Sequence, residues 1–381
     1  MKKLLTSLSL VVLVVFMVSC GKAAVIPESP STPETSPGIE TPVETSVETP
    51  AETPTETPAE TPAETPAEGI SLEDLYPFTP NVEKVFDGMG NEFASFVENV
   101  DFIDGNKMQV RMNNGGTEMV TVIERTQDAI KVVYEEGEVY YRENFLSKAA
   151  NISRIILMEP IAVGTTWTNF GNEKNTITAI DKMVKTPYGE LKAVEVTVNG
   201  SGGSAEQTLN YYAEGLGLIM KVSKGEGYEV SSLLEELKTD ATWKKVINFY
   251  YPNADEKITL YRKSFEFKTN DIPRNLIMDA YKDVPDNMLR VLTPNTKVNS
   301  LYLNKDGRVY VDLSKDFITE MNLGSGFEMM VLQSLANTLG DYYGVSKVML
   351  TIDGKTYESG HILLEKFEPL EVNYDGVIDM N

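Results

Sequence analysis

Residues 27–68 are a low-complexity segment that cannot join a folded core. The segment is built from short units of Thr, Pro, Ala, Val and Glu, and it contains ten prolines, ten glutamates and no basic residue. Proline fixes the backbone torsion φ and donates no backbone hydrogen bond, and neighbouring glutamates repel one another. Too little apolar surface is present to offset the entropy lost on ordering. We therefore predict a disordered stalk over residues 21–70, with a reach on the order of 100 Å at about 3.1 Å per residue of polyproline II.

The first twenty residues resemble the signal peptide of a bacterial lipoprotein. A short basic start is followed by a largely apolar run, residues 4–18, which is too short for a comfortable transmembrane helix. The run leads to Met-Val-Ser-Cys-Gly at residues 17–21, which resembles a lipobox with methionine at the position where leucine is usual. The resemblance implies that Cys20, the only cysteine, carries lipid and begins the mature chain. We expect a chain without disulfides that is anchored to the membrane outside the cytoplasm; the alternative is an ordinary secretory signal.

The charge of the chain argues against nucleic acid as a partner. The formal net charge is −23, and basic residues outside the stalk occur only singly or in pairs. Nucleic-acid binding needs a basic surface that displaces counterions from phosphates. We therefore expect the chain to bind the membrane through its lipid anchor and to have a second copy of itself or another envelope protein as a possible partner. We expect no nucleic acid as a partner.

Residues 71–240 have the pattern of antiparallel β-structure. Short runs rich in β-branched and aromatic residues alternate with turn signals such as Asp104-Gly105 and Glu136-Gly137. The pattern predicts a β-rich domain built on an antiparallel sheet or a half-barrel. Residues 211–220 resemble a Tyr-Tyr-Ala and Gly-x-Gly-Leu strand motif of bacterial surface lipoproteins, and residues 163–167 resemble a second such motif. We interpret the two glycines of the first motif as a tight bend before the last strand.

Residues 241–381 predict a second domain, in which helices cover one face of a small sheet. A helix is expected over residues 272–284, with Pro273 in its first turn. An Asp306-Gly307 turn predicts a hairpin. The expected strands are residues 245–251, 257–261, 298–303, 308–313 and 348–352.

A second helix is predicted to start at a capping box, in which Ser325 and Glu328 each bond the backbone N–H of the other. Gly340 and Gly344 are expected to close it. Met329, Leu332 and Ala336 widen its apolar surface beyond one core-facing stripe. We expect first that these three residues are buried under the β-rich domain of the same chain. The alternative is a possible interface with another subunit, because large exposed apolar patches usually mark interfaces.

Several motifs of this second part resemble the GerMN domain, the sporulation and spore-germination domain. Residues 309–317, Val-Tyr-Val-Asp-Leu-Ser-Lys-Asp-Phe, resemble its core motif. Further matches are Gly324-Ser325 with Glu328, residues 335–339, 345–348 and 352–355, and residues 294–298 with Asn295 unmatched. The resemblance covers about residues 244–366, in one copy. It implies a small αββαβ fold like that of ring-building envelope domains, in proteins that are lipid- or membrane-tethered. Such domains also occur in lipoproteins of bacteria that do not sporulate.

Catalytic signals are scarce. The single histidine, His361, excludes a multi-histidine metal site and lies in a predicted edge strand. No nucleophile elbow or phosphate-binding loop is present. We therefore expect no catalytic residue, no metal site and no cofactor.

The sequence thus predicts an α+β chain with a signal peptide (1–20), a stalk (21–70), a β-rich domain (71–240) and a GerMN domain (241–381). The function that we expect is a non-enzymatic scaffold of the cell envelope, linked to sporulation or germination. The alternative is a ligand-binding lipoprotein whose β-rich domain holds an apolar molecule or a wall polymer. That alternative predicts a continuous apolar cavity within residues 76–220.

Overall fold

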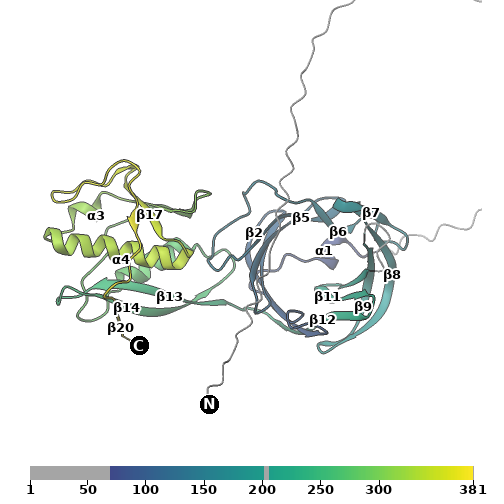
Figure 1. Cartoon of the computed structure of the whole chain (residues 1–381). Coiled ribbons are helices and arrows are strands. Elements are labelled where there is room, and N and C mark those ends of the chain that lie inside the picture. The colour runs from purple at the N-terminus through teal and green to yellow at the C-terminus, as the bar shows by residue number, and fades with distance from the viewer. Residues whose placement is uncertain (1–68, 201–205, 381) are drawn as a thin grey trace, which may run out of the picture. The chain divides into compact units, whose positions relative to one another are not determined.

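The computed structural model describes residues 69–200 and 206–380. The predicted signal peptide, Cys20 and almost all of the predicted stalk lie outside these residues. The described part is mainly antiparallel β-structure with few helices, as the sequence predicts (Figure 1).

Twelve strands form one antiparallel sheet that curls until its two edges meet (Figure 1); we call it the curled sheet. The order across it is β6-β5-β4-β3-β2-β1-β12-β11-β10-β9-β8-β7. Strands adjacent in sequence therefore pair with each other except β6 and β7, which are the two edges, and β1 also pairs with β12. The strands are β1 (Glu83–Met89), β2 (Phe96–Asp104), β3 (Lys107–Asn113), β4 (Glu118–Arg125), β5 (Ala129–Gly137), β6 (Arg154–Met158), β7 (Thr166–Asn169), β8 (Glu173–Thr186), β9 (Gly189–Asn199), β10 (Gln207–Ala213), β11 (Gly217–Gly225) and β12 (Tyr228–Lys238), with a 3-10 turn η1 (Phe170–Asn172) between β7 and β8.

The two edge strands of the curled sheet, β6 and β7, are joined by side chains. The indole Nε1 of Trp167 donates to the carbonyl of Ile155 at 3.0 Å. The amide of Asn169 donates to the same carbonyl at 3.1 Å and accepts from the Ile155 N–H at 2.9 Å. Because Trp167 is also buried, its place in the motif at residues 163–167 is explained by closure of the sheet.

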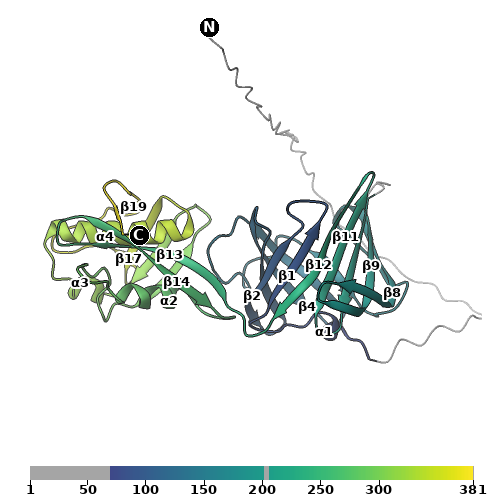
Figure 2. The ribbon, with the colours of Figure 1, turned by 90° about the horizontal axis from the view of Figure 1, so that it is seen from below.

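Helix α1 (Leu72–Leu75) lies inside the curled sheet at one end, which we call the α1 end (Figures 1 and 2). Ser71 and Asp74 form a reciprocal capping box at its start. Leu72 and Leu75 are buried against apolar side chains of the surrounding strands. The backbone N–H of Gly215 donates to the Asp74 carbonyl at 2.7 Å, so the helix is tied to the β10–β11 turn.

The predicted bend within residues 211–220 is this β10–β11 turn. Gly215 and Gly217 have φ of 74° and 77°, values that favour glycine. The prediction that β11 is the last strand is wrong, because a second tight turn at Gly227 leads into β12.

The described residues after the curled sheet form two small sheets and three helices. One sheet has the order β13-β14-β20, and the other has the order β15-β16-β17-β18 with β19 also paired to β17. The strands are β13 (Trp243–Pro252), β14 (Ile258–Phe267), β15 (Val298–Leu303), β16 (Val309–Leu313), β17 (Lys347–Ile352), β18 (Lys355–Thr356), β19 (Leu370–Glu371) and β20 (Ile378–Asp379). The helices are α2 (Pro273–Lys282), α3 (Asp316–Thr319) and α4 (Ser325–Tyr343).

Helix α4 begins differently from the prediction. Gly324 is its N-cap, Ser325 is already helical, and no side chain caps the end. Glu328 is buried, and its carboxylate accepts a 2.7 Å hydrogen bond from the Tyr357 hydroxyl. The predicted capping box is therefore wrong: the helix starts one residue earlier than the box requires, and Glu328 turns toward Tyr357.

The C-terminal end of α4 also differs from the prediction. Gly344 is the left-handed C-cap, with φ of 68°, but Gly340 lies inside the helix. A Cβ at Gly340 would come within 2.2 Å of Val372 Cγ2 and 2.8 Å of the Val345 carbonyl oxygen. Glycine is needed at position 340 for this close approach of the chain after β19.

This contact gives a stability prediction. Gly340→Ala should lower the free energy of unfolding by about 1–3 kcal/mol, because the added methyl group overpacks a rigid site. Gly326→Ala is the matched control in the same helix, since a Cβ there meets nothing within 4 Å. It should be neutral or stabilising by about 0.5 kcal/mol. Urea denaturation of both variants measures the difference, and equal effects would contradict the packing argument.

The main hydrophobic core extends across the predicted boundary at residue 240. It contains residues of β13, α2, α4 and β16, together with Val120 and Val122 of β4 and Phe145 from the β5–β6 connection. A second core fills the α1 end of the curled sheet. The described residues accordingly group as one compact unit.

Candidate functional site

The curled sheet has a polar inner face at the end opposite α1, which we call the loop end. The connections β1–β2, β3–β4, β7–β8 and β11–β12 lie at this end, because successive antiparallel strands reverse direction (Figure 2). Within β10, Thr208 and Asn210 lie on the same face as Tyr212, which packs with α1 inside the sheet. Their ladder partners on β11 are Ser223 and Lys221. These four polar residues therefore face the interior.

Two cavities open at the loop end, and they share one residue. The first, of about 220 Å³, is lined by Arg154, Ile155, Ile156, Asn169, Glu173, Asn175, Val198, Thr208, Asn210, Tyr212, Leu218 and Lys221. The second, of about 320 Å³, is lined by Asn91, Phe93, Ala94, Phe96, Met112, Asn114, Lys221, Ser223, Val230 and Ser232. Lys221 thus lies where the two cavities adjoin.

The acidic groups in and beside these cavities already have partners. Arg154 forms an ion pair with Glu135 on the neighbouring strand β5. The carboxylate of Glu173 accepts hydrogen bonds from Asn169 at 3.2 Å and from Asn175 at 3.4 Å. The negative charge on the inner face is therefore neutralised or hydrogen-bonded.

Lys221 differs from these groups, because within the described residues its ammonium group has neither a hydrogen bond nor an ion pair. Lys221 is exposed to solvent, but the protein around it partly desolvates the ammonium group and lowers its pKa, and the like charge of Arg154 lowers the pKa further. The carboxylates of Glu173 and Glu135 act in the opposite direction without contacting the ammonium group.

The interior does not match the apolar cavity that the ligand-binding alternative predicts. At the α1 end the space is filled by Leu72, Leu75 and the strand side chains around them. The cavities at the loop end are lined by amides, hydroxyls and charged groups as well as by apolar residues. The open part of the interior therefore suits a polar ligand better than a purely apolar one.

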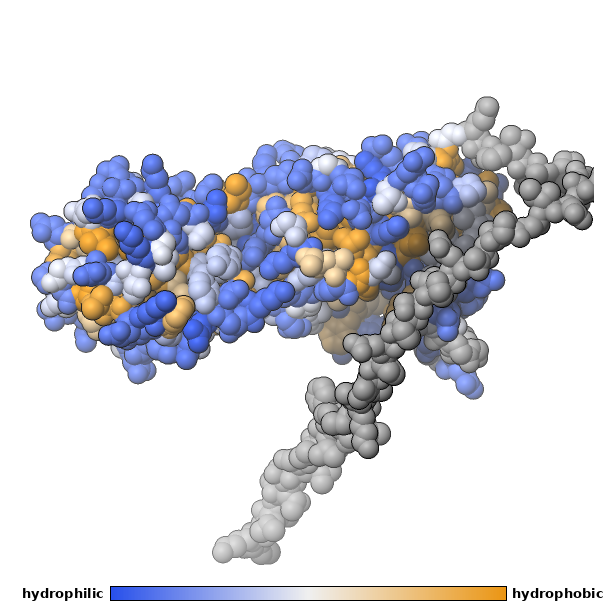
Figure 3. Space-filling model, turned by 90° about the horizontal axis from the view of Figure 1, so that it is seen from above, coloured by the Kyte–Doolittle hydropathy of each residue, from blue (hydrophilic) through white to orange (hydrophobic). Residues whose placement is uncertain are grey.

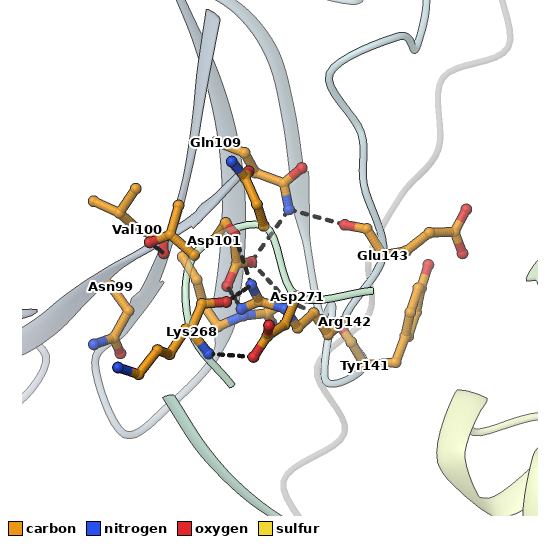
Figure 4. Close-up of polar contacts among 12 residues, drawn as sticks. Asn99, Val100, Asp101, Gln109, Tyr141, Arg142, Glu143, Lys268 and Asp271 are labelled. Carbon is orange, nitrogen blue, oxygen red and sulfur yellow. Dashed lines mark hydrogen bonds and ion pairs between the residues drawn. The ribbon is translucent and has the colours of Figure 1, made fainter. Parts of the chain in front are cut away.

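A second polar cluster, on the outer face of the curled sheet, is structural (Figure 4). Asp101 of β2 is fully buried and bonds Arg142 Nη1 at 2.6 Å and Arg111 Nη2 at 3.1 Å. The amide of Gln109 donates to the same carboxylate at 3.2 Å. Both arginines are buried, and Arg111 also pairs with Glu118 at 2.9 Å. We call this cluster the buried ion network.

The buried ion network connects the curled sheet to the rest of the chain. The second guanidinium nitrogen of Arg142 donates to the carbonyls of Asp101 at 2.6 Å and Lys268 at 2.8 Å (Figure 4). The backbone N–H of Arg142 donates to the Tyr342 hydroxyl of α4 at 3.0 Å. Strand β2, the β5–β6 connection, the β14–α2 loop and α4 therefore meet at one arginine.

Sequence reasoning missed both clusters, although one signal for them was present. Asp101 and Arg111 each interrupt an otherwise apolar stretch of strand, at Val100-Asp101-Phe102 and Val110-Arg111-Met112. A charged residue in such a position is rarely buried without a partner of opposite charge. For Lys221 no comparable signal exists, because its neighbours Met220 and Val222 are equally typical of a half-exposed strand.

The predicted interface residues on α4 are only partly available. Met329 is exposed at 61%, but Leu332 and Ala336 are buried at 3% and 0% in the main core. The alternative of an exposed interface is therefore wrong for these two residues. Helix α4 packs against β13 and also against β16, β17 and β19, so it needs apolar residues on more than one side.

The remaining sequence features are Cys20, His361, metal-binding clusters and membrane-spanning helices. Cys20 lies outside the described residues. His361 is exposed in a loop, where only the single bridge between Glu358 and Leu363 forms, so the predicted edge strand is wrong. Within residues 69–200 and 206–380, no cluster of three His, Cys, Asp or Glu side chains could hold a metal ion. None of the helices in the described ranges is long and apolar enough to cross a membrane.

Comparison with known proteins identifies the second part of the chain. Residues 248–358 match the family model Germane, described as sporulation and spore germination. This part of the chain is a GerMN-type domain. No curated protein matches the chain.

Among solved structures, the tandem GerMN domains of the sporulation protein GerM from Bacillus subtilis are 19% identical, with a TM-score of 0.27 over 33% of this chain and 46% of that chain. The chain thus covers less than half of the tandem protein. The first GerMN domain of GerM alone is also 19% identical, with a TM-score of 0.27. The match covers 97% of that domain and 33% of this chain. A Clostridium perfringens protein named as a lipoprotein is 17% identical, with a TM-score of 0.23 over 34% of this chain and 87% of that one.

Proposed function

We propose that this chain is a non-enzymatic, lipid-anchored component of the bacterial cell envelope that takes part in sporulation or spore germination. The observation that carries the proposal is the GerMN-type domain at residues 248–358. The lipobox-like sequence around Cys20 supports the anchor, because the only cysteine of the chain stands at the position of lipid attachment.

The elements of the GerMN-type domain support a role in assembly. Apart from the short α3, the order α2, β15, β16, α4, β17 is compatible with an αββαβ module of the kind found in ring-building envelope domains. In this proposal the domain associates with a second copy or with another envelope protein. The buried ion network then holds the curled sheet in a fixed position relative to the associated domain, which a flexible linker would not do.

Parts of the surface are consistent with such association. Figure 3 shows one face that is largely hydrophilic, with apolar side chains gathered in several separate areas. In the GerMN-type domain, Tyr302 and Tyr310 stack across β15 and β16 with ring centroids 5.6 Å apart, and Tyr302 is exposed. Together with Met329, these aromatic rings are candidate contact residues of the domain.

The anchor gives a direct prediction. Cys20→Ser should abolish incorporation of labelled fatty acid and move the protein from the membrane fraction to the soluble fraction or leave it as an unprocessed precursor. The reason is that the lipid is attached through the cysteine sulfur, which serine lacks. Metabolic labelling and fractionation of both forms measure the change. A variant that still partitions fully with the membrane would contradict lipid anchoring.

The link to sporulation is tested in the bacterium from which the chain comes. Deleting the gene should reduce the yield of heat-resistant spores or slow their germination, and the wild-type gene should restore both. The Cys20→Ser gene should restore them less well, because the protein would no longer be held at the membrane. Normal spore yield and germination in the deletion strain would overturn the proposed role.

A further inference from the structure

We propose that the loop end of the curled sheet is a binding site for a small organic anion, whose negatively charged group binds the ammonium group of Lys221. The site goes beyond the proposed assembly role, since it lies on a different part of the chain. The first argument is charge. Three charged side chains line the two cavities: Arg154, Glu173 and Lys221. Arg154 is bonded to Glu135 and Glu173 to two amides, which leaves Lys221 as the group without a partner among the described residues.

Lys221 is exposed to solvent, so its ammonium group stays hydrated and is open to a ligand. The protein that surrounds it nevertheless lowers its pKa by partial desolvation, and the like charge of Arg154 lowers the pKa further. A ligand anion would supply the opposite charge that the described residues do not.

The neighbours of Lys221 add hydrogen-bonding groups. Across the β10–β11 ladder it is paired with Asn210, whose side-chain amide has no hydrogen bond within the described part of the chain. Across the β11–β12 ladder it is paired with Ser232. Directly paired residues on one face of a sheet have Cβ atoms about 4.5–5.5 Å apart, so one ligand can contact both Lys221 and Asn210.

The apolar lining indicates that the anion has an organic body. Tyr212 and Leu218 lie beside Lys221 in the first cavity, and Phe93, half exposed, lines the second. The second cavity, of about 320 Å³, is at the low end of the range for small-molecule sites, about 300–1,000 Å³, and the first, of about 220 Å³, lies below it. This points to a ligand of sugar-acid or sugar-phosphate size. A carboxylate and a phosphate would bind the ammonium group in the same way, so the test distinguishes them.

Titration calorimetry at low salt on the full-length lipidated protein in detergent tests the site. The probes are N-acetylmuramic acid, which carries a carboxylate, glycerol 3-phosphate, which carries a phosphate, and N-acetylglucosamine, which is neutral. We expect at least one anionic probe to bind, with the neutral sugar binding at least about tenfold more weakly, because charge-assisted hydrogen bonds are worth more than neutral ones. The probe that binds identifies the source of the anion.

Lys221→Met should weaken binding of that probe by about tenfold or more. It should leave the melting temperature nearly unchanged, because Lys221 is exposed to solvent. Lys224→Met is the matched control: Lys224 lies on the same strand, three residues away, and pairs with Glu229 at 3.1 Å. This control should leave binding unchanged. Asn210→Ala, a second variant inside the site, should weaken binding several-fold, so the test does not depend on Lys221→Met folding.

Two results would overturn the proposal. One is the absence of binding for both anionic probes at millimolar concentration. The other is binding that Lys221→Met and Asn210→Ala leave unchanged, which would place the anion elsewhere. Either result would leave the envelope role intact, because that role is tested by the anchor and by the deletion strain.

Discussion

Asp101→Asn should lower the free energy of unfolding by about 3–5 kcal/mol, one of the two largest effects that we expect from a single substitution in this chain. The substitution keeps the size of the side chain but removes the charge between Arg142 and Arg111, both of which are buried. Arg111 retains Glu118, whereas Arg142 loses its carboxylate partner within the described residues. Burial already lowers the pKa of Arg142, and the charge of Asp101 opposes that effect, so the arginine depends on this partner.

The matched control for this substitution is an exposed ion pair. Glu266 pairs with Lys244 at 3.3 Å, and both side chains are more than half exposed. Glu266→Gln should change the free energy of unfolding by less than about 1 kcal/mol, because solvent screens exposed pairs. Urea denaturation followed by circular dichroism measures both variants. Similar small effects for the two would show that the buried ion network contributes little to stability.

The same experiment reports on the connection between the curled sheet and the remaining chain. The guanidinium group of Arg111 lies 4.6 Å from the centre of the Trp243 ring, at the start of β13. Loosening of the network should therefore change the fluorescence of Trp243 before the protein unfolds. In a Trp167→Phe background, which leaves Trp243 as the only tryptophan, this change can be followed by itself.

The antiparallel strands and the GerMN motifs could be predicted because their signals are local. Val309, Val311 and Leu313 alternate in sequence and are all buried on one face of β16. The Asp312 between them explains part of the motif. Its carboxylate accepts hydrogen bonds from Thr351 at 2.6 Å and from the backbone N–H of Gly354 at 2.8 Å. Burial alone would raise the pKa of Asp312, but these bonds outweigh it and lower the pKa.

Closure of the sheet and the two polar clusters could not be predicted because their contacts are distant in sequence. Asp101 meets Arg142, and Trp167 reaches Ile155, through pairing that no local pattern encodes. The candidate binding site depends on which strand face is enclosed, and that follows only from the closed order of all twelve strands. Lys221 would be an ordinary surface residue if the same hairpin stood at the edge of a flat sheet.

The error on α4 has the same origin, and it leads to the second large effect. A helical pattern shows which residues share a face, but it does not show how many faces are covered. Leu332 and Met329 are three residues apart, and yet one is 3% and the other 61% exposed. Leu332→Glu should lower the free energy of unfolding by at least about 4 kcal/mol, because an unpaired carboxylate would enter the main core.

Met329→Glu is the matched partner of that variant, since the same charge is introduced one helical turn away. It should leave the melting temperature nearly unchanged, because the side chain already faces solvent. If Met329 also belongs to an association surface of the GerMN-type domain, this variant should weaken association, measured by light scattering, without unfolding the protein. Unfolding of both variants would show that position 329 is packed. Stable folding of Leu332→Glu would show that α4 is covered on fewer sides than its contacts with β13, β16 and β17 require.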